Sequence, residues 1–160
     1  GEMLVWIPRV ESVARPTPWP TVATTSTVSV SGKSRRNPKM INDGEDPPSS
    51  IDSASYFDWW PAKGTTEWVE YAFQKPATVS EVDVYWFDDT GQGEVRVPAS
   101  WRILYRDGDT WKPVTPGGAY RVERDRYNRV AITPVTTTGL RLELTMQPKW
   151  SAGLQEWTVK

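Results

Sequence analysis

Hydrophobic and polar residues alternate with a period of two along much of this chain. The alternation is clearest in residues 139–146, where three leucines and a methionine occupy the even positions. Successive side chains of a β-strand point to opposite faces, so this pattern predicts a strand with one face in a core and the other toward solvent. The same alternation predicts strands at residues 66–73, 79–87 and 100–106.

Turn-forming residues lie between these segments. They are Lys75-Pro76, Asp107-Gly108-Asp109, Pro116-Gly117-Gly118 and Thr138-Gly139. Fourteen prolines disfavour long helices, and no stretch has the periodicity of an amphipathic helix. Short antiparallel strands need two apolar sheet faces that cover one another, so the sequence predicts an all-β antiparallel β-sandwich of jelly-roll type.

The first residues differ from the rest of the chain. Residues 14–21 contain three prolines in eight positions, which is typical of a stiff extended connector. We therefore expect a proline-rich linker at residues 14–23 and the sandwich at residues 24–160. Residues 1–13 are interpreted either as the tail of a preceding domain or as an extra edge strand of this one.

Composition favours binding over catalysis. The 160 residues include ten tryptophans but no histidine and no cysteine, the side chains most used for acid-base and nucleophilic chemistry. Nineteen basic and twenty acidic residues give a net charge of −1, which argues against a nucleic-acid partner. No apolar run reaches the roughly 20 residues of a membrane helix, and the N-terminus lacks a signal-peptide pattern, so no membrane partner is expected.

Oxygen donors are dense in residues 40–50, MINDGEDPPSS. Carboxylates, hydroxyls and backbone carbonyls are the ligands of Ca²⁺, although the spacing is not that of an EF-hand loop. The alternative interpretation is a solvated turn whose Asp and Ser side chains cap local backbone groups.

Tryptophans at Trp59 and Trp60 occupy adjacent positions where a loop enters a strand. Neighbouring residues of an extended segment point to opposite sides, so both cannot enter one core, and at least one is expected at the surface. Lys63 follows in the same loop. Trp150, in the segment Lys149 to Gly153, is a further loop aromatic.

Residues 85–101 combine aromatic, acidic, amide and basic side chains. Asp88, Asp89 and Arg96 follow the aromatic end of a predicted strand. Sugars offer apolar CH faces that stack on rings and hydroxyls that need donors and acceptors, so this set fits a glycan site. The alternative is a charged hairpin in which Asp88 pairs with Arg96.

Glycoside hydrolysis requires only two carboxylates, and Asp88, Asp89, Glu94 and Glu67 supply enough of them. Adjacent aspartates at a strand end point in opposite directions, however, and these loops resemble no catalytic family. We therefore expect no enzymatic activity.

The order of several motifs resembles the discoidin, or coagulation factor five/eight C-terminal type, galactose-binding-like domain. The motifs are Asn42-Asp43-Gly44, Trp68 to Tyr71, residues 79–87, Pro98 to Arg106, and GLRLEL with Gly153 to Trp157. WWPAKGTTEWV and VYWFDDTGQGEVRVPASWRILY more narrowly resemble the C-terminal accessory modules of bacterial glycoside hydrolases, such as β-L-arabinofuranosidase-like enzymes. The resemblance covers about residues 24–160.

The resemblance implies a structural Ca²⁺ between Asp43 and Glu156, with Asp46 and Ser49 as further donors. Pro47-Pro48 departs from the common pattern, so a carbonyl of Met40 or Glu45 is an alternative ligand. The resemblance also implies a glycan site in the loops at one end of the sandwich. Its expected ligand-binding residues are Trp59 or Trp60 as the stacking platform, with Lys63, Asp88, Asp89, Arg96 and Trp150.

The function expected from these features is that of a non-catalytic carbohydrate-binding module of a modular bacterial glycoside hydrolase. Its partners would be a polysaccharide or oligosaccharide, of plant type or other, and the parent hydrolase domains in cis. A monomer that is secreted, periplasmic or at the cell surface is expected. The alternative is a structural accessory domain that packs on its parent glycosidase without binding glycan.

Overall fold

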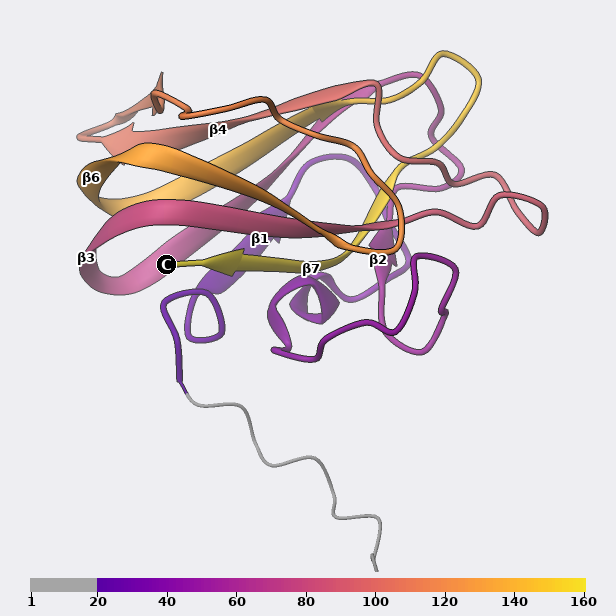
Figure 1. The fold of residues 1–160 in the computed structure, drawn as a ribbon, viewed down its shortest axis with the longest axis horizontal. Coiled ribbons are helices and arrows are strands. Elements are labelled where there is room, and N and C mark those ends of the chain that lie inside the picture. The colour runs from indigo at the N-terminus through magenta and orange to yellow at the C-terminus, as the bar shows by residue number, and fades with distance from the viewer. Residues whose placement is uncertain (1–19) are drawn as a thin grey trace, which may run out of the picture.

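The computed structural model describes residues 20–160, and their regular secondary structure is almost entirely β-strand (Figure 1). The one helical element is a short 3-10 helix, η1 (Pro38–Asn42), which begins after the capping residue Asn37. The strands are β1 (Thr27–Val30), β2 (Phe57–Asp58), β3 (Thr66–Phe87), β4 (Ser100–Asp107), β5 (Thr110–Pro113), β6 (Tyr127–Thr145) and β7 (Gly153–Val159). No helix among the described residues has the length and apolar character required to cross a membrane.

Two long bent strands, β3 and β6, join the layers of an antiparallel sandwich. The N-terminal half of β3 pairs with β1 and with the C-terminal half of β6, which continues to β4 and β5. The second half of β3 pairs with the first half of β6 and with β7, and β7 pairs with β2. The hydrogen-bonded order is β2-β7-β3-β6-β4-β5, and β1 adds to β3. This architecture confirms the predicted all-β antiparallel sandwich.

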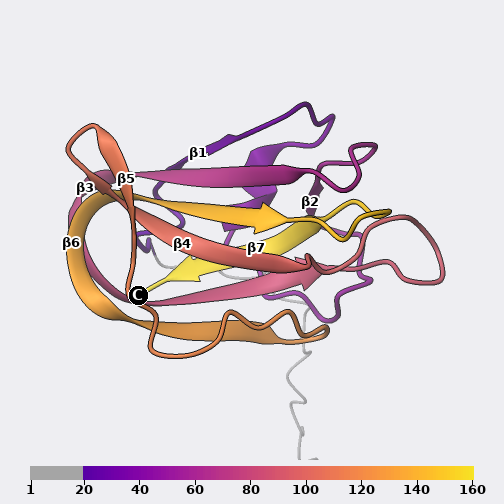
Figure 2. The same ribbon diagram turned by 90° about the horizontal axis from the view of Figure 1, so that it is seen from above.

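Two predicted turns lie inside continuous strands. Lys75-Pro76 falls at the bend of β3, where the pairing with β6 shifts between Ala72 and Ala77. Thr138-Gly139 falls within β6 at the same end of the molecule, where both strands curve from one layer to the other (Figure 2). Proline and glycine occur at bulges and bends of strands as well as in turns. The predicted change of chain direction at these two places is therefore correct, and the predicted end of the strand is wrong.

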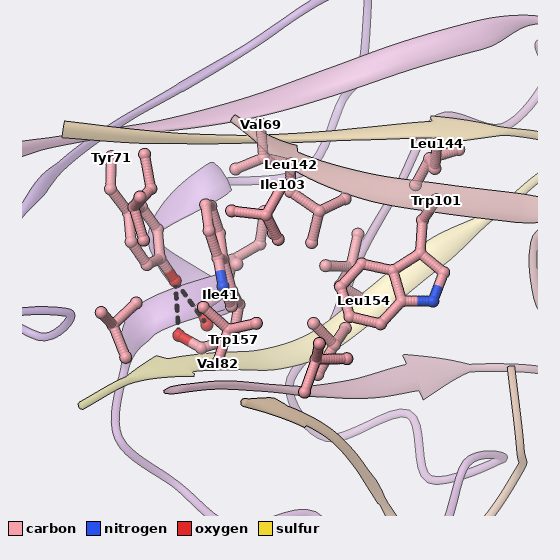
Figure 3. Packing of buried hydrophobic residues seen from close by; sticks show 14 of the residues in the cluster. Ile41, Val69, Tyr71, Val82, Trp101, Ile103, Leu142, Leu144, Leu154 and Trp157 are labelled. Carbon is pink, nitrogen blue, oxygen red and sulfur yellow. Dashed lines mark hydrogen bonds between the residues drawn. The ribbon is translucent and has the colours of Figure 1, made fainter. Parts of the chain in front are cut away.

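The core is filled by aromatic and branched side chains from both layers, as the sequence alternation predicted. Trp157 of β7 stacks on Tyr71 of β3, with ring centroids 4.0 Å apart, and the Tyr71 hydroxyl donates a 2.8 Å hydrogen bond to the Trp157 carbonyl (Figure 3). Trp86 packs edge-on against Trp101 at 5.4 Å. All of these side chains are buried. Trp86, Trp101 and Trp157 therefore belong to the core, whereas Trp68 and Trp111 are only partly buried.

One end of the sandwich gathers the long loops. The loops at residues 59–65, 88–99 and 146–152 lie together at the end opposite the bends of β3 and β6 (Figures 1 and 2). The predicted unit at residues 1–13 and residues 14–19 of the predicted linker lie outside the described residues. Packing against the core begins by Val22, and Ala23 is buried.

Candidate functional site

A pocket of about 640 Å³ opens among the loops at this end. It is lined by Arg35, Arg36, Tyr56, Asp58, Trp60, Asp89, Gln92, Gly93, Glu94 and Val95. These residues come from three separate segments: the connection after β1, the edge strand β2 with its flanks, and the loop after β3. A concave site with an exposed aromatic ring and several polar groups is the usual form of a small-ligand site.

Trp59 and Trp60 point to opposite sides, as predicted. Trp59 is fully buried, packs edge-on against Phe57 at 5.0 Å, and donates from Nε1 to the Ser31 carbonyl at 3.0 Å. Trp60 is 46% exposed and lines the pocket. Trp59 is therefore wrong as a candidate platform, because both faces of its ring are packed in the core. Trp60 is the exposed member of the pair.

Glu94 holds the Trp60 side chain from across the pocket. Trp60 Nε1 donates to Glu94 Oε1 at 3.3 Å, and Lys63 Nζ donates to Glu94 Oε2. The hydrogen bond from Lys63, followed by that from Trp60, lowers the pKa of the Glu94 carboxyl. Lys63 does not line the pocket. Lys63 contacts Glu94, which is itself part of the pocket lining.

Asp88 is a structural residue of the loop after β3. Its carboxylate is buried and accepts hydrogen bonds from the backbone amides of Thr90 at 3.0 Å and Val97 at 2.9 Å. Its own amide donates to the Ser50 carbonyl at 2.9 Å. Asp88 was predicted to bind ligand; it does not line the pocket, because both carboxylate oxygens accept hydrogen bonds that close the loop, and a direct ligand contact stays a prediction.

Asp89 follows Asp88 and faces the pocket. Its Oδ1 accepts from the Val95 amide at 2.8 Å and pairs with Arg96 Nη1 at 3.4 Å. A Cβ on Gly93 would lie 2.1 Å from Asp89 Oδ2, so the glycine is what allows the loop to pass so close to this carboxylate. The predicted alternative of an Asp88–Arg96 pair is not what forms, because Arg96 turns to Asp89.

Arg96 and Trp150 contact each other behind the pocket. The Arg96 guanidinium lies 3.8 Å from the centre of the Trp150 ring and donates to the carbonyls of Gly93 and Val95 at 2.9 Å each. Neither Arg96 nor Trp150 lines the pocket. Both were predicted as ligand-binding residues; their contacts within the protein are those described here, and a ligand contact of either stays a prediction.

The opposite wall is built on Tyr56 and Arg36. The Tyr56 ring stacks on Phe87 at 3.8 Å, and the Arg36 guanidinium covers its other face at 3.6 Å. Arg36 Nε also lies 3.6 Å from Asp58 Oδ2. Asp58 is mostly buried, and this burial raises the pKa of its carboxyl although Arg36 opposes the rise.

Four lining residues were missed by the sequence analysis: Arg35, Arg36, Tyr56 and Asp58. Two signals were present for them. The run of basic residues Lys33 to Arg36 stands in a loop, and Tyr56-Phe57-Asp58 directly precedes the tryptophan pair. Neither signal indicates which other segments of the chain form the pocket together with these residues.

A second group of carboxylates surrounds Glu156 of β7. Glu156 is buried, and neither of its carboxylate oxygens has a hydrogen-bond partner among the described residues. Burial, followed by the nearby carboxylates of Asp43 and Asp46, raises the pKa of Glu156 to about 10. A close approach of the Asp43 carboxyl adds to the rise and the Gly44 amide opposes it, although the geometry of both contacts falls short of a hydrogen bond. A buried carboxylate without a partner is costly unless a proton or a cation neutralises it.

The predicted calcium ligands have unequal positions. Asp43 accepts from the Glu45 amide at 2.9 Å and from the Ser55 hydroxyl, and Asp46 Oδ1 accepts from the Tyr127 hydroxyl at 2.6 Å. Ser49 contacts the neighbour of Glu156: its carbonyl accepts from Gln155 Nε2 at 2.8 Å. Adjacent strand residues point to opposite sides, so this contact places the Ser49 carbonyl with Gln155, and a role of Ser49 as a calcium ligand stays a prediction.

The oxygen donors at Glu156 fit a hard cation in part. Asn42 Oδ1 is buried and has no partner among residues 20–160, while its Nδ2 donates to the carbonyls of Ala23 and Ser26. A cavity of about 400 Å³ is lined by Asn42, Gly44, Asp46, Tyr127 and Glu156 among others. No three acidic side chains of the described part converge into a metal site by themselves. A cation here would need amide and backbone oxygens as well, as Ca²⁺ commonly does.

No family model matches the chain. Solved structures do. The Streptococcus pneumoniae β-galactosidase BgaA structure aligns with a TM-score of 0.73 at 18% identity, covering 89% of this chain and 96% of that one. Chitosan-binding module 1 of a Paenibacillus sp. IK-5 chitosanase/glucanase aligns at 0.63 and 18% identity, with 87% and 97% covered. The protein has the galactose-binding-like fold.

The chain is also similar in structure to the family 32 carbohydrate-binding module of NanJ from Clostridium perfringens, which was solved in complex with galactose. That alignment has a TM-score of 0.64 at 14% identity and covers 86% of this chain and 96% of that one. These identities show a common fold, and the predicted galactose-binding-like architecture is confirmed. A fold hosts many functions, so what this galactose-binding-like domain binds must be argued from its own residues.

Proposed function

We propose that this domain binds a glycan, without catalysis, in the pocket at the loop end of the sandwich. The observation that carries the proposal is Trp60, a large aromatic residue that is 46% exposed at a pocket lined mostly by charged and amide groups. The fold adds support, because domains of this architecture include sugar-binding modules such as that of NanJ.

Binding would combine stacking with directed hydrogen bonds. The apolar CH face of a sugar ring would lie on the Trp60 indole, and its hydroxyls would donate to Asp58 and Asp89 and exchange hydrogen bonds with Gln92. The platform is positioned before binding, because Trp59 anchors the chain on one side and Glu94 holds the indole N–H on the other. Preorganisation of this kind lowers the entropic cost of association.

The carboxylates that could serve a glycosidase are already engaged. Asp88 closes its loop, and Glu67 accepts from Ser31 Oγ at 2.8 Å and Thr65 Oγ1 at 2.6 Å. The pKa of Glu94 is lowered, the opposite of what a general acid needs. Asp58 is the pocket carboxyl with a raised pKa, and Arg36 is positioned to pair with it. These contacts support a binding role over hydrolysis.

A glycan array followed by calorimetry on the best ligand tests the proposal. Trp60→Ala should lower affinity at least tenfold, about 1.4 kcal/mol, and leave the unfolding temperature nearly unchanged. Trp111→Ala is the matched control, because Trp111 lies on β5 at the other edge of the sheet from β2. Binding that survives Trp60→Ala unchanged would remove this residue, and the pocket with it, from the proposal.

Hydrolysis is tested separately with aryl glycosides and polysaccharides. We expect no release of sugar. Release that disappears in an Asp58→Asn variant would replace the binding proposal with a catalytic one, because a glycosidase needs a carboxyl of raised pKa as its acid.

We further propose that a structural Ca²⁺ is held near Glu156. Glu156, Asp43 and Asp46 would supply charge, and Asn42 Oδ1 would supply a neutral oxygen. When bound, the ion would neutralise the Glu156 carboxylate. The support is the buried carboxylate itself, which has no partner among the described residues.

The setting we propose is a monomeric accessory domain of a secreted or cell-surface bacterial glycoside hydrolase. A structural module that packs on its parent hydrolase is the competing role. The two differ at Trp60: a packing role would bury this side chain against the neighbouring domain. Acrylamide quenching of tryptophan fluorescence, compared between wild type and Trp60→Phe in the full-length protein, distinguishes them.

A further inference from the structure

Positive charge is concentrated on one rim of the pocket. The described segment from residue 20 to residue 42 contains Lys33, Arg35, Arg36 and Lys39 and no acidic residue, in a chain whose net charge is −1. Arg35 and Arg36 line the pocket, and Lys33 precedes them on the same connection. Lys39 is directed elsewhere, because its Nζ donates to the Thr24 carbonyl at 3.0 Å.

The rim is fixed in place by Ser34. Ser34 Oγ donates to the Asp58 carbonyl at 2.7 Å and accepts from the Arg36 amide at 3.1 Å. The two arginines that follow Ser34 are therefore held beside β2.

Each carboxylate that lines the pocket already has a basic partner. Glu94 pairs with Lys63. Asp89 pairs with Arg96 at 3.4 Å, and Asp58 lies 3.6 Å from Arg36. The acidic groups of the pocket are thus neutralised by the protein itself.

Arg35 is the exception. It lines the pocket, is exposed, and forms no ion pair or hydrogen bond with the residues that the structure describes. The lining residues carry three negative charges and two positive ones; with Lys63 and Arg96, which pair with Glu94 and Asp89 but lie outside the lining, the sum is one positive charge, that of Arg35. Arginine offers five N–H donors in a planar fork that matches the oxygens of a carboxylate or a sulfate.

We propose that the glycan bound in this pocket carries an anionic group, a carboxylate or a sulfate, that pairs with Arg35. The inference rests on the proposed glycan function and narrows its substrate class to acidic sugars. It also separates this pocket from a binder of cationic sugars: an amino sugar would meet carboxylates that are already paired and an arginine that repels it.

Calorimetry with four oligosaccharides of equal length tests the charge preference: oligogalacturonate, neutral galacto-oligosaccharide, sulfated galacto-oligosaccharide and glucosamine oligomer. We expect at least tenfold tighter binding of an acidic oligomer than of the neutral one, with the advantage shrinking as salt is raised. The uronate and sulfate arms tell the two anionic groups apart.

Arg35→Gln should remove the preference for the acidic oligomer and retain binding of the neutral one. Lys75→Gln is the control, because Lys75 lies at the bend of β3, away from the loop end. Equal affinity for charged and neutral oligomers, or tighter binding of the glucosamine oligomer, overturns the acidic-sugar inference while the glycan function stands. Absence of binding to any oligomer, and to a broad array, overturns the glycan function itself.

Discussion

Two acidic regions of this domain differ in whether their carboxylates have partners within the protein. In the loop pocket, Asp58, Asp89 and Glu94 each have a basic partner. Around Glu156 the carboxylate is buried, has no hydrogen-bond partner among the described residues, and has further carboxylates beside it. The protein supplies the neutralising charge in the first region and leaves it to be supplied from outside in the second.

The difference separates two functions that a count of acidic residues cannot separate. Paired carboxylates at a pocket wall keep their hydrogen-bonding oxygens and lose their attraction for cations, which suits neutral hydroxyls or, beside Arg35, an anion. An unpaired buried carboxylate is unstable as an anion until a cation or a proton arrives. The following experiments test this contrast.

Glu156→Gln should give the largest effect. Calcium at a thousandfold excess over its Kd would stabilise the wild-type domain by about 4 kcal/mol, and the variant should lose this response. Differential scanning calorimetry with and without calcium measures it. Glu143→Gln, on a carboxylate already paired with Arg102, should keep the response. An equal calcium response in all three proteins would show that the ion binds elsewhere.

Asp88→Ala should destabilise the domain by about 2 kcal/mol, because the amides of Thr90 and Val97 lose their acceptor. Glycan affinity should fall as well, since the loop that carries Asp89 is no longer closed. Urea unfolding and calorimetry report the two effects, and Asp109→Ala in the exposed β4–β5 turn is the control. A loss of affinity with unchanged stability would mean that Asp88 contacts the ligand directly.

Stability without calcium should fall as pH rises. The Glu156 pKa is raised to about 10 in the folded state, so the folded state holds a proton that the unfolded state releases above its ordinary pKa of 4.5. Unfolding is therefore favoured between these two values, by at most about 1.4 kcal/mol per pH unit. Calcium should offset the fall, and its stabilising effect should grow from about pH 5 to pH 8. A pH-independent calcium response would argue against Glu156 as a ligand.

Glu94→Gln should have the smallest effect on stability. The glutamine keeps an oxygen for Trp60 Nε1 and gives up the ion pair with Lys63. Exposed ion pairs contribute little, so thermal unfolding and the calcium response should match those of the wild type. A marked drop in the unfolding temperature would show that the pocket wall depends on this pair.

Much of the sandwich could be predicted because strand alternation is a local property. The pattern in residues 139–146 identified the core face of β6, and the register with β3 places Leu142 opposite Val69 in that core. The bends in β3 and β6 could not be distinguished from turns, because proline and glycine occur in bends and in turns alike. The strand pairing that continues beyond each bend joins residues far apart in the sequence, so no local pattern reveals it.

The site was harder to predict because it joins distant segments. Strand geometry required that Trp59 and Trp60 diverge, and the apolar Phe57 two residues before Trp59 was a signal that Trp59 shares its core side. Nothing local indicates that Arg35 and Glu94 line the same pocket, because only the packed fold brings their loops together. The contact between Arg96 and Trp150 could not be predicted for the same reason: the two residues are far apart in the sequence and contact each other in the structure.

The closure of the loop after β3 by Asp88 has a consequence for how this domain can diversify. One buried side chain fixes the Thr90 amide and the Val97 amide, and the residues between them reach the pocket. Substitutions at Gln92 or Glu94 can therefore alter which sugar is recognised while the hydrogen bonds of Asp88 and the sheets remain intact. Gly93 is the constrained position of that stretch, because any side chain there would strike Asp89. Substitutions at the other pocket-lining positions of this loop can therefore change specificity with little effect on stability.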